Sequence, residues 1–107
     1  MAKAVVEVDP GICGFPARIS ASSEDGMACS LVIESGCEAI TALAAELTQV
    51  DAYEVAFTNF AENPVYLAAS RHYKHAACPV PSAIVKAVEI ACRLALPKAV
   101  HFAPKVE

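Results

Sequence analysis

The sequence carries little charge, and the charge it has is not gathered into patches. Charged residues make up 19% of the 107 positions, hydrophobic residues make up 56%, and the formal net charge is −4. The eight lysines and arginines are scattered singly or in short groups, so no basic stripe is available to neutralise phosphates. We therefore expect no nucleic-acid partner, and the high apolar content argues against a disordered chain.

Long apolar runs are missing as well. No stretch approaches the ~20 consecutive apolar residues of a membrane-spanning helix, so we expect no membrane partner. Glu7 interrupts the first residues where a signal peptide needs an unbroken apolar segment, and we therefore expect a cytoplasmic protein. The length predicts a single domain over residues 1–107. The apolar excess is as compatible with a homo-oligomer as with a core alone, and nothing in the sequence identifies a protein partner.

Paired cysteine motifs are absent, although five cysteines are present. No two of them have C-x-x-C spacing, and an odd number in a reducing cytoplasm is not a disulfide framework. They are therefore free thiols, ligands or core residues. Cys29 alternates with apolar residues of an expected strand, and Cys92 lies inside an apolar helix, so we interpret both as core residues.

What the sequence does contain is a run of short strands followed by helices. Alternation of period two predicts a three-stranded meander whose strands cover residues 3–8, 15–22 and 27–34. Helical spacing and capping residues predict helices over residues 37–47, 51–60 (which could also be a strand), 63–72 and 78–95, then a strand over residues 99–102. We expect Ser35 to be the N-cap of the first helix, with Glu38 at its third position. The predicted class is α+β, a small, mostly antiparallel sheet (the three-stranded meander plus the C-terminal strand) packed with helices.

The order of these elements places three cysteines at one end of the sheet. Cys13 follows the first strand, and the third strand returns to the same end before Cys37. Cys78 joins them if the last helix runs back along the sheet. Each position favours a thiolate, because glycines flank Cys13 and helix starts hold Cys37 and Cys78. The prediction is a site at this end.

From this placement we predict that Cys13, Cys37 and Cys78 hold an iron–sulfur cluster or a zinc ion. His75 precedes Cys78 by three residues and is a candidate fourth metal ligand, although a solvated histidine is the commoner outcome in a loop. Two alternatives stay open: a metal-free thiol protein (a sulfur carrier or a redox protein) that uses Cys78, and a structural or interaction domain whose cysteines have no chemistry. The sequence assigns no catalytic residue and does not decide whether the protein is an enzyme.

One local motif resembles a known family. The segment Cys78-Pro79-Val80-Pro81-Ser82-Ala83-Ile84-Val85-Lys86 is similar to the C-P-x-P signature of the TusA/SirA sulfur-carrier family. The resemblance implies that Cys78 opens a helix and carries a persulfide, and that Lys86 is the basic residue that follows it. That family has the motif after its first strand, whereas here it lies near the C-terminus.

A second resemblance spans nearly the whole chain. It is carried by the segments Gly11-Ile12-Cys13-Gly14-Phe15, Glu34-Ser35-Gly36-Cys37 and His75-Ala76-Ala77-Cys78-Pro79-Val80-Pro81-Ser82. These resemble an uncharacterised family of small cysteine-containing proteins from anaerobic bacteria and archaea. The resemblance supplies no activity, but it implies an anaerobic setting in which iron–sulfur or sulfur chemistry is common.

Overall fold

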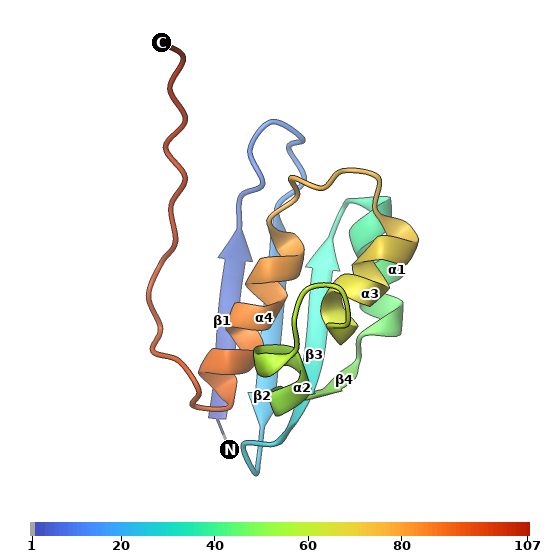
Figure 1. Cartoon of the computed structure of the whole chain (residues 1–107), viewed down its shortest axis with the longest axis vertical. Coiled ribbons are helices and arrows are strands. Elements are labelled where there is room, and N and C mark those ends of the chain that lie inside the picture. The colour runs from blue at the N-terminus through green and yellow to red at the C-terminus, as the bar shows by residue number, and fades with distance from the viewer. Residues whose placement is uncertain (1) are drawn as a thin grey trace.

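The computed structural model describes residues 2–107 and has one antiparallel sheet with all its helices on one face (Figure 1). The strands lie in chain order across the sheet: β1 (Ala2–Val8), β2 (Ala17–Ser23), β3 (Ala28–Ser35) and β4 (Gln49–Asp51). The helices are α1 (Glu38–Glu46), α2 (Ala52–Phe57), α3 (Pro64–His72) and α4 (Val80–Ala91). The predicted α+β class, with a small antiparallel sheet packed by helices, is confirmed.

The alternation of the meander separates a core face from an exposed one. Ile19, Leu31 and Ile33 point to the helices and are buried. The opposite side, which we call the open face, consists of three cross-strand rows: Lys3–Ser22–Ser30, Val5–Ser20–Val32 and Glu7–Arg18–Glu34. No helix covers it in the part of the chain that is described (Figure 1). The open face is therefore built of short polar side chains around two valines, with charges at its two ends.

A continuous apolar core fills the space between sheet and helices. Helix α4 lies across β1 and β2, α1 packs against β3, and α2 and α3 pack against α4. The largest fully buried side chains come from both layers: Ile19, Ile40, Leu43, Val55, Val65, Val80, Ile84 and Val88. Cys29 and Cys92 are buried in this core, which confirms their interpretation as core residues.

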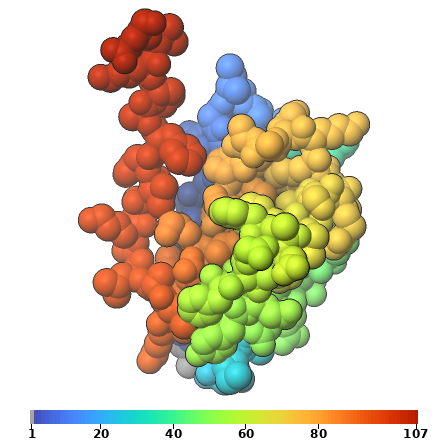
Figure 2. Space-filling model, viewed as in Figure 1, coloured from blue at the N-terminus to red at the C-terminus, as the bar shows by residue number. Residues whose placement is uncertain are grey.

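The fourth strand is not the predicted one. It is β4, which pairs with the start of β3 and leads directly into α2, where the Ala52 amide donates to the Met27 carbonyl at 2.7 Å. The predicted strand over residues 99–102 does not form. Residues 96–107, which we call the C-terminal tail, have no regular structure and are exposed throughout. Figure 2 shows the tail standing beside the body of the molecule. Its alternating apolar side chains are exposed and are not buried in the core.

Two helix starts also differ from the prediction. The N-cap of α1 is Cys37 and not Ser35, because β3 continues through Ser35, which pairs with Ala17. The Ser35 hydroxyl instead accepts a hydrogen bond from the Cys37 amide at 3.2 Å. Helix α4 begins after its N-cap Pro79, so Cys78 lies just outside the first turn.

Helix α4 ends earlier than predicted, and hydrogen bonds explain why. The Leu94 amide donates to the Glu89 carbonyl at 2.8 Å and the Arg93 amide to the Ile90 carbonyl at 3.2 Å. Arg93 has a φ of 62°, the left-handed conformation that closes a helix in a Schellman motif. An arginine is an unusual residue there, so the sequence pattern continued the helix to residue 95. Nowhere in residues 2–107 is a helix both long and apolar enough to cross a membrane.

Candidate functional site

Three segments that are distant in the sequence meet at one end of the molecule. They are the loop over residues 9–16, the β3–α1 junction at residues 36–37 and the connection over residues 73–79, all at the upper end in Figure 1. Each carries one of the predicted site residues, Cys13, Cys37 and Cys78. Cys29 and Cys92 belong to the start of β3 and the end of α4, at the opposite end. The strand order therefore predicted the end at which Cys13 and Cys37 lie, and the expected return of the last helix predicted the same end for Cys78.

Cys13 sits in an exposed turn closed by glycines. The Gly14 amide donates to the Gly11 carbonyl at 3.0 Å, and both glycines have positive φ, 73° and 86°. Only glycine adopts this conformation without strain, so the two residues set the turn that presents Cys13. Phe15 then lies over Gly36, where an added Cβ would meet its ring at 3.4 Å. This contact brings the Cys13 loop next to the junction that holds Cys37.

Cys37 is the N-cap residue of α1, but its side chain does not cap the helix. Its backbone is extended, its carbonyl accepts from the Thr41 amide at 2.9 Å, and its thiol makes no capping hydrogen bond. Serine or aspartate would normally satisfy the first amides of a helix here. The half-buried Cys37 thiol packs against the core and stays free for other chemistry.

Cys78 lies at the other helix start of this end. It is half-buried against the core, and Pro79 after it is the N-cap of α4. The Pro79 carbonyl accepts from the Ala83 amide at 3.0 Å and from the Ser82 hydroxyl at 2.9 Å. Pro79 and Pro81 restrict the backbone around the first turn, so the direction of the Cys78 side chain is held by a rigid frame.

Tyr73 lies near all three thiols and was not among the predicted site residues. Its hydroxyl oxygen is buried and has no hydrogen-bond partner among residues 2–107. Burial raises the pKa of the phenol well above its ordinary value of 10.0, and the nearby thiols of Cys78, Cys37 and Cys13 raise it further. Cys78 lies beside the hydroxyl, but the two groups do not meet the geometry of a hydrogen bond. Tyr73 is therefore a protonated donor without an acceptor, among three thiols.

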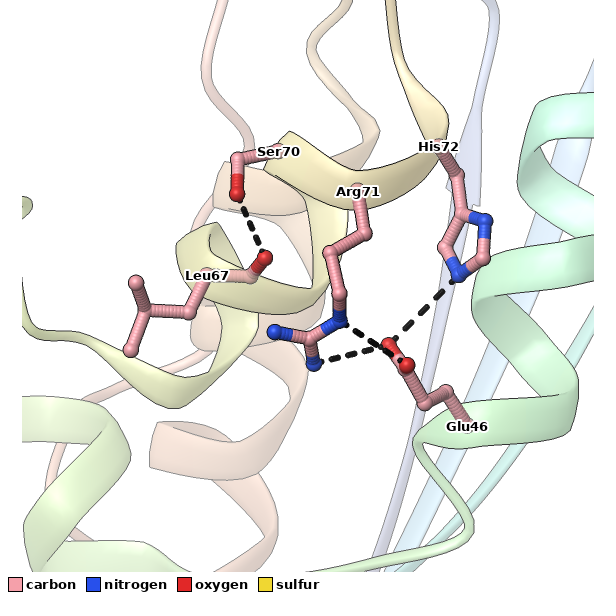
Figure 3. A network of polar contacts seen from close by, with 5 residues as sticks. All are labelled: Glu46, Leu67, Ser70, Arg71 and His72. Atoms are coloured by element: carbon pink, nitrogen blue, oxygen red, sulfur yellow. Dashed lines mark hydrogen bonds and ion pairs between the residues drawn. The ribbon is translucent and has the colours of Figure 1, made fainter.

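An ion-pair network joins α1, which begins after Cys37, to α3, which ends before Tyr73 (Figure 3). Arg71 of α3 donates from Nε and Nη2 to the two carboxylate oxygens of Glu46 at the end of α1, both at 3.0 Å. His72 Nε2 lies 3.6 Å from Glu46 Oε2. The hydrogen bonds from Arg71 lower the pKa of Glu46 below its ordinary 4.5. A two-pronged arginine–carboxylate contact fixes orientation, so it helps to set where Tyr73 leaves α3.

The thiols are near one another without forming a closed metal site. Within residues 2–107, no three histidine, cysteine, aspartate or glutamate side chains lie close enough together to hold a metal ion. His75, the predicted fourth ligand, is exposed, and no hydrogen bond or ion pair in the described chain involves it. The metal site thus stays a prediction, and binding one ion through all three thiols needs a change from the arrangement described here.

One signal could have identified Tyr73 from the sequence. It is the only aromatic residue of the segment Ser70-Arg71-His72-Tyr73-Lys74-His75-Ala76-Ala77, which otherwise consists of polar residues and alanine. A single aromatic side chain in a polar connection often anchors that connection to the core. Its proximity to Cys13 and Cys37, however, depends on tertiary structure.

Comparison with known proteins gives a family but no relative of established activity. No curated protein and no solved structure matches the chain. A family model described as "Family of unknown function (DUF6951)" matches residues 4–103. The match includes all but the first two residues of β1, the other three strands, all four helices and the three thiol-bearing segments. The expectation of an uncharacterised family is confirmed, and the chain belongs to the family of unknown function DUF6951.

Proposed function

We propose that this protein binds a thiophilic metal centre, an iron–sulfur cluster or a zinc ion, through the thiolates of Cys13, Cys37 and Cys78. The observation that carries the proposal is the convergence of three thiols on the buried Tyr73 hydroxyl, which has no acceptor among residues 2–107. Thiolates are the ligands that both kinds of centre prefer. We place this chemistry in a reducing cytoplasm, where free thiols persist.

The Tyr73 hydroxyl supports a negatively charged ligand. Leaving a buried donor without an acceptor costs about 1–3 kcal/mol, so a bound group that accepts from this hydroxyl would remove that cost. Because burial keeps this phenol protonated, its hydroxyl is available to donate a hydrogen bond at neutral pH. A metal-bound thiolate or a cluster sulfide is an acceptor at that position. The hydroxyl would then orient the sulfur of Cys78, its nearest thiol, as outer-shell donors do in other metal sites.

The Cys13 loop supplies the movement that the proposal needs. Cys37 and Cys78 are anchored by the core, whereas Cys13 is exposed and lies in a turn whose glycines have no atom within 4 Å of an added Cβ. Such a turn can close over a ligand at little packing cost. With three protein thiolates, a fourth position is left for His75 or for an external molecule.

The test is the metal and sulfide content of protein purified without oxygen, for the wild type and for single Cys→Ser variants. We expect the wild type to retain a metal or cluster and the variants at Cys13, Cys37 and Cys78 each to lose it while keeping the wild-type circular dichroism. Cys29→Ala and Cys92→Ala are matched controls, because these thiols are buried at the other end, and both should retain it. A wild-type protein without metal after reconstitution with iron and sulfide, or with zinc, would end the proposal.

A second candidate is sulfur transfer through Cys78, favoured by the position of its thiol beside the Tyr73 hydroxyl. The Cys78 thiolate would attack the outer sulfur of a donor persulfide, forming a new S–S bond and releasing the donor thiolate. In that case only Cys78 is required for sulfur transfer, and the Cys13→Ser variant transfers sulfur nearly as well as the wild type. Mass spectrometry of protein treated with a persulfide donor would show one added sulfur atom on Cys78 in the metal-free wild type.

A further inference from the structure

The open face is the largest surface of the sheet without a cover. All four helices lie on its other side (Figure 1). Its middle row, Val5–Ser20–Val32, contains two valines that are 42% and 56% exposed. Aliphatic β-branched side chains in the centre of a bare sheet, with one serine between them, form a shallow surface that a second sheet can approach closely.

The charges at the two ends of this face are opposite. The row Glu7–Arg18–Glu34 has two carboxylates and one guanidinium, with Arg18 Nη1 at 3.1 Å from Glu7 Oε1. The row at the other end, Lys3–Ser22–Ser30, has one ammonium group. One end is therefore net negative and the other net positive, so the face is complementary to a copy of itself turned end to end.

We propose that the open face binds the open face of a second copy of this chain, with a twofold axis parallel to the sheets and perpendicular to their strands. This axis places Lys3 opposite the second copy's Glu7 and lays the valine rows on each other. The other simple twofold, along the strands, would instead bring Glu7 against the second copy's Glu34 and repel. An isologous contact of this kind repeats each interaction twice.

The size of the face predicts a weak dimer. Seven-residue strands are ~24 Å long and three strands span ~14 Å, at ~3.4 Å per residue and ~4.8 Å between strands. The pair of faces then buries roughly 700 Å², below the ~1,200 Å² of a standard stable interface. We therefore expect a weak association that depends on protein concentration and on salt, because the charged rows at the two ends determine which twofold arrangement forms.

Sedimentation velocity over about 5–500 µM tests the proposal, at low ionic strength with a reductant and EDTA so that neither disulfides nor metal bridges join molecules. The wild type should show a concentration-dependent rise towards a dimer. Lys3→Glu should weaken association at least about tenfold, because attraction becomes repulsion twice per dimer. Lys3→Glu combined with Glu7→Lys should restore association, because positions 3 and 7 of the two copies again carry opposite charges. Arg18 still faces Glu34 on the neighbouring strand.

Lys86→Glu is the matched control, because it makes the same charge change at an exposed position of α4, on the other layer. It should associate like the wild type. A wild type that is monomeric at the highest concentration would overturn the proposal. So would a Lys3→Glu variant that dimerises normally, or a double variant that fails to recover while its circular dichroism is native. Because the assay contains no metal, its outcome is independent of the thiol site.

Discussion

The five cysteines occupy two chemically different environments. Cys29 and Cys92 lie together in the core, where burial, and then the proximity of Cys92, raise the pKa of the Cys29 thiol to about 12. Cys13 is exposed, and Cys37 and Cys78 are half-buried at the surface of the core. Access therefore separates the two groups, and because the thiolate is the reactive form, the raised pKa of Cys29 lowers its reactivity further.

This separation predicts the outcome of thiol labelling. In the native, reduced and metal-free protein at pH 8, a disulfide reagent should modify three of the five cysteines quickly, with Cys13 the fastest. Cys29 and Cys92 should react only at the rate of unfolding, and all five should react in denaturant. Peptide mass spectrometry after timed quenching assigns each site. Rapid native labelling of Cys29 would contradict its burial in the core.

Tyr73 is the residue of the candidate site whose role could not be predicted from the sequence. Cys13 and Cys37 could be placed from the sequence, because each antiparallel strand reverses the chain and the strand order gives the end at which each loop lies, and Cys78 followed from a last helix that runs back along the sheet. The phenol could not, because its role depends on where the end of α3 meets two loops from other parts of the chain. Burial of one oxygen atom is a tertiary property, and no local pattern of residues encodes it.

Among the elements, the connection between α2 and α3 depends on Asn63, which is only 3% exposed. Its Oδ1 accepts from the Val65 amide at 3.0 Å and so caps α3. Its Nδ2 donates to the carbonyls of Val55 and Thr58, at 2.8 and 3.0 Å, and so satisfies the end of α2. One amide side chain therefore serves two helix ends.

Replacing Asn63 distinguishes these two roles. Asn63→Ala should lower the free energy of unfolding by about 2–3 kcal/mol, since it removes the cap and leaves buried carbonyls without donors. Asn63→Asp keeps the accepting oxygen but sets a carboxylate against two carbonyls, so at pH 7 it should be less stable than Asn63→Ala. Partial recovery near pH ~4, where the carboxyl can donate, is the expected signature in urea unfolding. Equal stability of Asn63→Asp and wild type would mean that only the α3 cap matters.

The elements that sequence reasoning identified are those with a repeated pattern. The meander alternates over seven or eight residues per strand, and α3 has both an N-cap and a following proline, so both were predicted closely. β4 has three residues with one apolar side chain among them, too few to show a period. Residues 99–102 show alternation but lack a partner strand, so their pattern predicted a strand that does not form.

For the whole molecule, the C-terminal tail is the part that stays exposed along its full length. Its large apolar side chains, Leu96, Val100, Phe102 and Val106, are all at least 60% exposed. By contrast, the residues just before it close α4, and Cys92 among them is buried. The boundary between structure and tail therefore lies at about residue 95.

Two truncations test this boundary. A chain ending at Leu96 should have a free energy of unfolding within about 0.5 kcal/mol of that of the full-length protein, because it loses only exposed residues. A chain ending at Ala91 should lose about 2 kcal/mol or more, because it gives up the buried Cys92 side chain and the hydrogen bonds that close α4. Guanidinium unfolding monitored by circular dichroism compares the three chains. A large loss on the first truncation would show that the tail packs against the domain.

The three thiols come from the first, middle and last parts of the chain, and this has a consequence for how the protein matures. A ribosome-bound chain has exposed Cys13 and Cys37 before the residues of α4 have emerged, and α4 must dock on β1 and β2 before Cys78 reaches them. The buried setting of Tyr73 is likewise absent until that step. The arrangement of the three thiols is therefore a property of the finished fold alone, and we expect that nascent or truncated chains would not bind the proposed metal centre.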